Sequence, residues 1–250
     1  MFTIRKTKPK NNKYYIRKAN GGYSNAIQGK PVDQYANVLA NCVGYANGRF
    51  AEIMGEVTGT EGIKYQLVCN AENFIEKAKK YGLRVAKKPH AGGILVWQKG
   101  KTLSGSDGAG HVAVVEEVYS DTSVYTSESN YGGTAFLNVK RSNSNGRWGI
   151  SSSAYKYLGC IVNPAVDPTK TNEELAKEVL RGLWGNGSKR KQALTDEGYD
   201  YDAVQKEVNK LLAKEIKAGD IVKVLSTAKV KSVSGSTATL TCYLDDLEKV

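Results

Sequence analysis

A proline-containing segment at residues 164–170 divides this chain into two parts with different sequence patterns. Pro164 and Pro168 lie within five residues of each other, and proline both fixes φ and removes a backbone N–H donor. Such a stretch disfavours regular structure and is typical of a linker. Helical and strand patterns mix before it, whereas short helical patterns follow directly after it. We therefore expect one domain over residues 1–163, a linker over 164–170 and smaller modules over 171–250.

The first part predicts two helices followed by an antiparallel sheet. Asn41 can cap a helix over 41–55, where apolar residues recur at helical spacing, and a helix over 70–81 is expected to end at Gly82. Strand patterns separated by Gly-rich turns follow at residues 93–97, 111–118, 124–129 and 157–162. Helices first and a sheet afterwards are typical of an α+β fold. Residues 1–23 are expected to form a basic N-terminal extension of this domain.

The second part predicts three short helices and then strands. Thr171 and Glu174 form a capping box for the first helix, Ser188 can cap the second, and Asp200 can cap the third. Three helices in so few residues indicate a compact three-helix bundle over 171–213. Residues 214–250 return to strand chemistry, with patterns at 220–225 and 236–243, and their role stays open.

The basic charge of the chain is concentrated in its first part. Residues 1–164 hold 22 Lys and Arg against 11 Asp and Glu, whereas residues 165–250 hold 14 of each. Such a surface favours polyanions: nucleic acid, anionic lipid or the teichoic acids of a Gram-positive wall. No apolar run approaches the roughly 20 residues of a membrane span, so membrane insertion is not expected. The N-terminal residues lack the apolar core of a secretory signal, so we expect synthesis in a cytosol.

Cys42 is the candidate nucleophile among four cysteines. It follows the capping Asn41 at the start of a helix, where unpaired N–H groups and the helix dipole stabilise a thiolate. The cysteines are widely spaced and contain no CxxC pair, which argues against a zinc site and against a disulfide framework.

The base that such a nucleophile needs must come from two histidines. His111 opens a hydrophobic strand directly after a Gly-rich loop, at the rim of the sheet, and is the better candidate. His90 lies in a turn beside two lysines and is interpreted as a solvated loop residue. Glu128 and Asn130 alternate on the next strand and therefore point to one face, where either can orient the imidazole.

Four segments in this order resemble the CHAP family, the cysteine, histidine-dependent amidohydrolases/peptidases. They are Asn41-Cys42-Val43-Gly44-Tyr45-Ala46-Asn47-Gly48-Arg49-Phe50, Gly92-Gly93-Ile94-Leu95-Val96-Trp97, Gly110-His111-Val112-Ala113-Val114-Val115 and Ser127-Glu128-Ser129-Asn130-Tyr131. The resemblance implies a papain-like α+β catalytic domain with Cys42 as nucleophile and His111 as general base. Glu128 then resembles the orienting acid and Asn130 a polar helper. Some relatives hold calcium in an acidic loop before the cysteine, but only Asp33 stands there, so no metal and no cofactor is expected.

Residues 170–212 are similar to the CW_7 repeat, a three-helix module whose members bind peptidoglycan fragments. The matching segments are Asn172-Glu173-Glu174-Leu175-Ala176-Lys177-Glu178-Val179, Gly182-Leu183-Trp184-Gly185-Asn186-Gly187 and Gly198-Tyr199-Asp200-Tyr201-Asp202-Ala203-Val204-Gln205. Arg190 matches the basic position of the repeat and can pair with a muropeptide carboxylate. Trp184 and Tyr201 can stack on sugar, although a role in the core of the module is at least as plausible for both.

The two resemblances together imply a phage endolysin that cleaves stem-peptide or cross-bridge amide bonds of Gram-positive peptidoglycan. It would be made in the host cytoplasm and act on the wall after release, with anionic wall polymers as further partners. An N-acetylmuramoyl-L-alanine amidase on the same scaffold and a non-catalytic peptidoglycan-binding protein are the alternatives. No nucleic-acid motif accompanies the basic charge, so no nucleic-acid partner is expected. The oligomeric state stays open.

Overall fold

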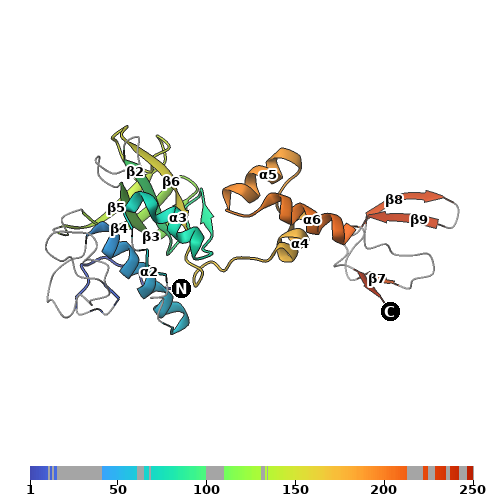
Figure 1. The fold of residues 1–250 in the computed structure, drawn as a ribbon. Coiled ribbons are helices and arrows are strands. Elements are labelled where there is room, and N and C mark those ends of the chain that lie inside the picture. The colour runs from blue at the N-terminus through green and yellow to red at the C-terminus, as the bar shows by residue number, and fades with distance from the viewer. Residues whose placement is uncertain are drawn as a thin grey trace. The chain divides into compact units, whose positions relative to one another are not determined.

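A computed structural model describes most of the chain as two compact units, Met1–Thr169 and Lys170–Val250 (Figure 1). The described residues are 1–10, 12, 14–15, 41–60, 65–67, 69–99, 110–130, 133 and 135–212, with the backbone of 222–224, 229–234, 237–241 and 247–249. The Gly-rich loop before Gly110, Asp33 and Cys242 lie outside these residues. In the described part of the chain, no helix is long and apolar enough to cross a membrane.

Unit 1 is a six-stranded antiparallel sheet with helices on one face (Figure 1). Its helices are α2 (Cys42–Thr58), the 3₁₀ turn η3 (Ala71–Asn73) and α3 (Phe74–Lys80). Its strands are β1 (Val85–Ala86), β2 (Ile94–Lys99), β3 (His111–Ser120), β4 (Ser123–Ser129), β5 (Phe136–Ser142) and β6 (Tyr155–Ile161), in the spatial order β1-β6-β2-β3-β4-β5. The α+β class expected from the sequence is confirmed.

The alternating side chains of the central strands build two apolar cores. Ile94 and Val96 of β2 pack with α2 and α3 on one face, while Leu95 and Trp97 pack on the other. The second core is closed by Trp148 from the segment between β5 and β6. Because both faces of β2 and β3 are covered, these strands show an almost continuous apolar run rather than a simple alternation.

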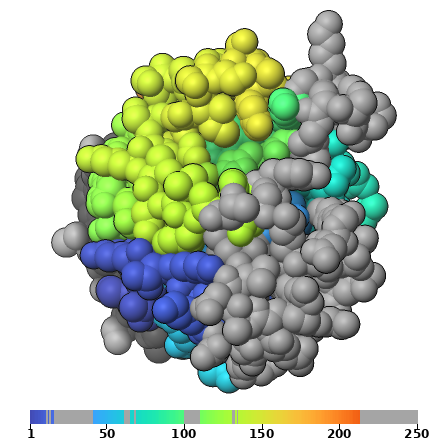
Figure 2. Space-filling model, turned by 90° about the vertical axis from the view of Figure 1, so that its left-hand side faces the viewer, coloured from blue at the N-terminus to red at the C-terminus, as the bar shows by residue number. Residues whose placement is uncertain are grey.

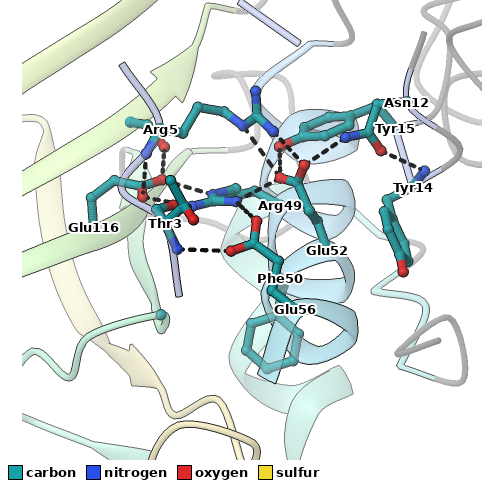
Figure 3. Close-up of polar contacts among 12 residues, drawn as sticks. Thr3, Arg5, Asn12, Tyr14, Tyr15, Arg49, Phe50, Glu52, Glu56 and Glu116 are labelled. Atoms are coloured by element: carbon teal, nitrogen blue, oxygen red, sulfur yellow. Dashed lines mark hydrogen bonds and ion pairs between the residues drawn. The ribbon is translucent and has the colours of Figure 1, made fainter. Parts of the chain in front are cut away.

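The N-terminal residues are part of this unit, because they lie against α2 and β5. Arg5 and Tyr15 both bond to Glu52 of α2, and a polar network around Arg49 joins them (Figure 3). Figure 2 shows residues 1–10 (blue) on the surface beside β5 (yellow-green), where Asn138 Nδ2 donates to the Arg5 carbonyl at 3.0 Å. The basic extension expected over 1–23 therefore packs onto the domain wherever it is described.

The segment expected to be a linker begins as a part of unit 1. Ala165 and Val166 pack against the helix-side core, and the Asp167 carboxylate pairs with Arg84 at 2.6 Å and with His90 Nδ1 at 2.7 Å. His90 is only 16% exposed, so the interpretation of this residue as a solvated loop histidine was wrong. The two lysines that precede His90 in sequence do not indicate that it pairs with Asp167, which lies 77 positions later.

Unit 2 holds three helices around a small apolar cluster: α4 (Asn172–Leu180), α5 (Gly187–Asp196) and α6 (Tyr201–Leu212). The capping box of Thr171 and Glu174 is present, and Asp200 Oδ1 accepts from the N–H groups of Asp202 and Ala203. Ser188 does not cap α5, because that helix starts earlier and its N-cap is Asn186. Gly187, which has a left-handed backbone conformation (φ +56°), is the first residue of α5, so Ser188 already lies inside the helix.

The last residues form two separate strand pairs. β7 (Val222–Val224) pairs with β10 (Leu247–Lys249), and β8 (Lys229–Ser234) pairs with β9 (Thr237–Thr241), both antiparallel. The strands expected at 220–225 and 236–243 correspond to β7 and β9. Their partners β8 and β10 were not expected from the sequence.

Candidate active site

Cys42 is the first residue of α2 and lies in the helix-side core at 7% exposure. The Asn41 side chain accepts a hydrogen bond from the Gly44 N–H at 2.9 Å, as expected for an N-cap. The first turn contains no acidic side chain, so nothing in it opposes the positive end of the helix dipole. The sulfur is therefore held at a helix terminus that favours negative charge.

His111, the first residue of β3, links Cys42 to Glu128. Its Nε2 lies 2.5 Å from Glu128 Oε2, and its ring also hydrogen-bonds to the Cys42 side chain. Since Nε2 is engaged by the carboxylate, Nδ1 is the nitrogen available to the sulfur. The structure thus brings together three of the four residues that the sequence selected: Cys42, His111 and Glu128.

The protonation state of His111 follows from these contacts. Burial alone would lower the pKa of this imidazole, but the hydrogen bonds to Cys42 and Glu128 outweigh burial and raise it to about 9. For Glu128, burial acts to raise the pKa, while His111 and Arg141 together hold it below the usual value. The geometry therefore favours an imidazolium between two acidic groups at neutral pH.

Asn130, the fourth selected residue, closes the turn after β4. Its Oδ1 accepts from the Ala135 N–H at 3.2 Å, and its backbone N–H donates to the Ala135 carbonyl at 3.3 Å. Its carbonyl accepts from the Gly133 N–H at 3.0 Å. These contacts shape the loop next to Glu128, while the carboxylate of Glu128 is the group bonded to the imidazole.

Arg141 on β5 is a site residue that the sequence analysis missed. Its Nη2 lies 2.7 Å and 2.9 Å from the two oxygens of Glu128, and its side chain is 7% exposed. Glu128 pairs with Leu137 and Val124 pairs with Arg141, so the register places Glu128 and Arg141 on the same face of the sheet. The arginine side chain extends along this face past Thr126 to reach the acid. β5 itself was not predicted, so nothing in the sequence analysis placed an arginine beside the acid.

Trp97 and Gly110 shape the floor of the site. The Trp97 ring stacks near the His111 ring, with centroids 5.9 Å apart and an interplanar angle of 29°. Gly110 has φ +74°, and a Cβ there would lie 1.9 Å from the Trp97 carbonyl oxygen. Only glycine therefore allows β3 to begin directly against β2 and to place His111 opposite Trp97.

The candidate wall-binding residues have separate partners in unit 2. Trp184 Nε1 donates to Glu178 at 2.9 Å and its ring meets Tyr199 edge-on at 6.0 Å, whereas the Tyr201 ring lies under the Lys191 ammonium. Arg190 donates to the Gly185 carbonyl, to Gln205 Oε1 and to Asn186 Oδ1, at 3.1 to 3.2 Å. Arg190 thereby holds the loop before α5 against α6.

The part of the chain that is described contains no group of three His, Cys, Asp or Glu side chains placed to hold a metal ion. Among the described residues, Cys42, Cys69 and Cys160 form no disulfide. The site itself presents a thiol, an imidazole and a carboxylate, with the imidazole in contact with the other two.

Known proteins are similar to both parts of the chain. The CHAP domain family matches residues 31–130, and the CW_7 repeat matches residues 173–212. A lysozyme from Streptococcus phage Cp-7 is 40% identical over 71 residues, which are 26% of this chain and 21% of that protein. A solved N-acetylmuramoyl-L-alanine amidase from Staphylococcus aureus is 24% identical, with a TM-score of 0.31 over 48% of this chain and 30% of its own. The chain therefore matches less than a third of the length of either protein.

Proposed function

Since the chain carries a CHAP domain and a CW_7 repeat, we propose that it is a peptidoglycan hydrolase of the phage-endolysin kind. Its CHAP domain cleaves amide bonds in the stem peptide or cross-bridge of Gram-positive walls. The observation that carries the proposal is the line of hydrogen bonds from Cys42 through His111 to Glu128.

The proposed reaction is acyl transfer through a thioester. The Cys42 thiolate attacks the amide carbonyl, and the C–N bond breaks as protonated His111 gives its proton to the departing amine. Neutral His111 then takes a proton from water, which attacks the thioester and releases a carboxylic acid and the Cys42 sulfur. Glu128 holds the imidazole in the tautomer that faces Cys42 and stabilises its charged form.

Backbone N–H groups at the start of α2 are the proposed oxyanion donors. The Gly44 N–H is taken by the Asn41 side chain, and the Tyr45 N–H by the Asn41 carbonyl at 2.8 Å. The N–H groups of Cys42 and Val43 precede them and, in helix geometry, have no intrahelical acceptor. They lie beside the reacting sulfur, where negative charge develops on the carbonyl oxygen.

The CW_7 repeat is the proposed peptidoglycan-binding module, with Arg190, Trp184 and Tyr201 as candidate contacts. In this proposal Arg190 offers its charge to a muropeptide carboxylate, and the two rings offer faces to sugar. Unit 1 as a whole carries the basic surplus that attracts anionic wall polymers in this proposal.

Digestion of purified Gram-positive sacculi by wild type, Cys42→Ala and Cys69→Ala tests the proposal. Cys69 is the matched control, because it is a free thiol in the same unit and burial raises its pKa to about 11. Wild type and Cys69→Ala are expected to release new amino termini, and Cys42→Ala none. Mass spectrometry of the products then separates an endopeptidase from an amidase. Binding of all three proteins without any released fragment would overturn the hydrolase.

A further inference from the structure

The Arg141 side chain is held by several hydrogen bonds around Glu128. Besides the two bonds to Glu128, its Nε donates to Thr126 Oγ1 at 3.2 Å and its Nη1 to the Trp148 carbonyl at 3.0 Å. Its guanidinium carbon lies 5.0 Å from the centre of the Trp97 ring. Each of the three guanidinium nitrogens thus donates to a defined atom of unit 1.

We propose that Arg141 is a positioning residue of the catalytic machinery, which fixes the plane of the Glu128 carboxylate and through it the orientation of His111. The proposal rests on the proposed hydrolase and goes beyond it, because it adds a fourth side chain to the line of Cys42, His111 and Glu128.

A glutamate carboxylate held by a single hydrogen bond can still rotate about its terminal torsion. The terminal torsion of a carboxylate is broad, so a bond from His111 to one oxygen does not fix the carboxylate plane. Arg141 reaches both oxygens, at 2.7 Å and 2.9 Å, and Thr126 Oγ1 lies 3.2 Å from Oε1. Oε2 is then left pointing at His111 Nε2, in the orientation that directs the other ring nitrogen to Cys42.

Charge leads to the same conclusion. Glu128 is 3% exposed, and a buried carboxylate is stable as an anion only when cations compensate its lost hydration. His111 gives up its positive charge during the proposed reaction, when its proton moves to the leaving amine. Arg141 stays charged throughout, so Glu128 remains an anion while the imidazole cycles between its two states.

Trp97 connects the arginine to the imidazole by a second route. The same indole lies near the Arg141 guanidinium and the His111 ring, and its Nε1 is fixed by the Arg147 carbonyl at 2.9 Å. A shift of Arg141 therefore disturbs the packing of His111 as well as its hydrogen bond.

A purely structural role, in which Arg141 only joins β5 to β4, predicts loss of stability without change in the pH dependence. The test therefore compares Arg141→Gln, Arg141→Lys and the control Lys140→Gln. Lys140 is the neighbouring cation on β5, is exposed, and lies over the Tyr119 ring. Thermal melting establishes that each variant is folded before its kinetics are compared.

For Arg141→Gln we expect kcat on sacculi to fall roughly 100-fold, the loss typical of a reacting group displaced by about 1 Å, with little change in KM. The acidic limb of the pH profile should move to higher pH, because burial then raises the pKa of Glu128 with less opposition. Arg141→Lys keeps the positive charge but loses the simultaneous hydrogen bonds to both Glu128 oxygens. Its acidic limb should therefore stay near wild type while kcat remains low. Lys140→Gln should behave as wild type.

Alkylation of Cys42 by iodoacetamide gives the same pH limb without substrate, when it is followed by mass spectrometry of the Cys42 peptide. A folded Arg141→Gln with wild-type kcat and an unmoved limb, while Glu128→Gln is inactive, would overturn the role of Arg141 and leave the hydrolase intact. If Arg141→Gln does not fold, full kcat in Arg141→Lys overturns the role instead. Sacculus cleavage by Cys42→Ala would overturn the cysteine mechanism of the proposed hydrolase, and the alkylation profile would still decide the effect of Arg141 on Cys42.

Discussion

At the scale of single residues, the charge on His111 decides what the site can do. Between Cys42 and Glu128 the imidazole keeps its proton up to about pH 9, so it is ready to act as an acid at neutral pH. A raised pKa also contributes to stability. That contribution is fully present below the unfolded value of about 6.5 and is lost as the pH rises through about 9.

Replacing Cys42 with alanine should lower the pKa of His111, because the hydrogen bond to Cys42 is among the contacts that raise it. The measurement is a pH titration of the imidazole Cε1 protons by NMR. The chain has two histidines, so a His90→Gln background assigns the signal. An unchanged titration midpoint in Cys42→Ala would show that Glu128 alone sets the charge of the ring.

The site residues were predictable from sequence only where their neighbours in sequence carried the signal. Cys42 follows the capping residue Asn41. His111 follows Gly110, where the Trp97 carbonyl leaves no room for a Cβ. Both residues therefore have a sequence neighbour that indicates their place. Arg141 and Asp167 act through partners far away in sequence, and a lone arginine or aspartate has no local pattern that names its partner. Their roles became visible only with the strand register and the fold.

At the scale of elements, α2 organises unit 1 through charges that are buried along its length. Arg49 on this helix is 1% exposed and bonds to Glu52, Glu116 and the Thr3 carbonyl (Figure 3). The Ser127 hydroxyl also donates to Glu116 at 2.6 Å, and the Tyr45 hydroxyl donates to Ser127 at 2.6 Å. The helix that presents Cys42 is thereby bonded to the strand that presents Glu128.

Arg49→Met should destabilise the protein by about 3–5 kcal/mol, because it leaves buried carboxylates without their cation. Urea unfolding followed by circular dichroism measures the loss. Lys80→Met is the matched control, since Lys80 pairs with Glu76 across exposed surface and its removal should produce no measurable change. Equal unfolding midpoints for the two variants would contradict a stabilising role for the network.

Elements with strong periodicity were predicted well, and elements at the edges were not. The helix expected at 41–55 is α2, which continues to Thr58 before the left-handed Gly59, and the expected strands correspond to β2, β3, β4 and β6. β1 and β5 were missed because they are the two edge strands of the sheet. An edge strand such as Phe136–Ser142 is half exposed and mixes Asn138, Lys140 and Arg141 with apolar residues, so it lacks the alternation that marks a strand.

At the scale of the whole molecule, two units of different charge are joined in one chain. The basic surplus belongs to unit 1, while unit 2 carries nearly equal numbers of acidic and basic residues. Attraction to anionic polymers is long-range and screened by salt, whereas recognition of a peptidoglycan fragment depends on short contacts. The two units should therefore respond differently to ionic strength.

Binding to sacculi that retain teichoic acid should weaken several-fold between about 0.1 M and about 1 M salt, where the screening length falls from about 10 Å to about 3 Å. Binding to sacculi stripped of teichoic acid should change little over the same range. Sedimentation of the full-length Cys42→Ala variant with each preparation measures both without digestion. Equal salt dependence for the two preparations would mean that the basic charge of unit 1 does not contact wall polymers.

The place of the N-terminal residues in unit 1 has a consequence for biosynthesis. The Arg5 N–H bonds to Glu116 at 2.9 Å and its carbonyl accepts from Asn138, so Arg5 is synthesised before these partners, which follow 111 and 133 positions later. At about 5–20 residues per second, this delay lasts roughly 6 to 27 s. During translation α2 can form early, but the buried charges around Arg49 are completed only after β5 has emerged. Nascent chains arrested before β5 should therefore be sensitive to protease, although they already contain both Cys42 and His111.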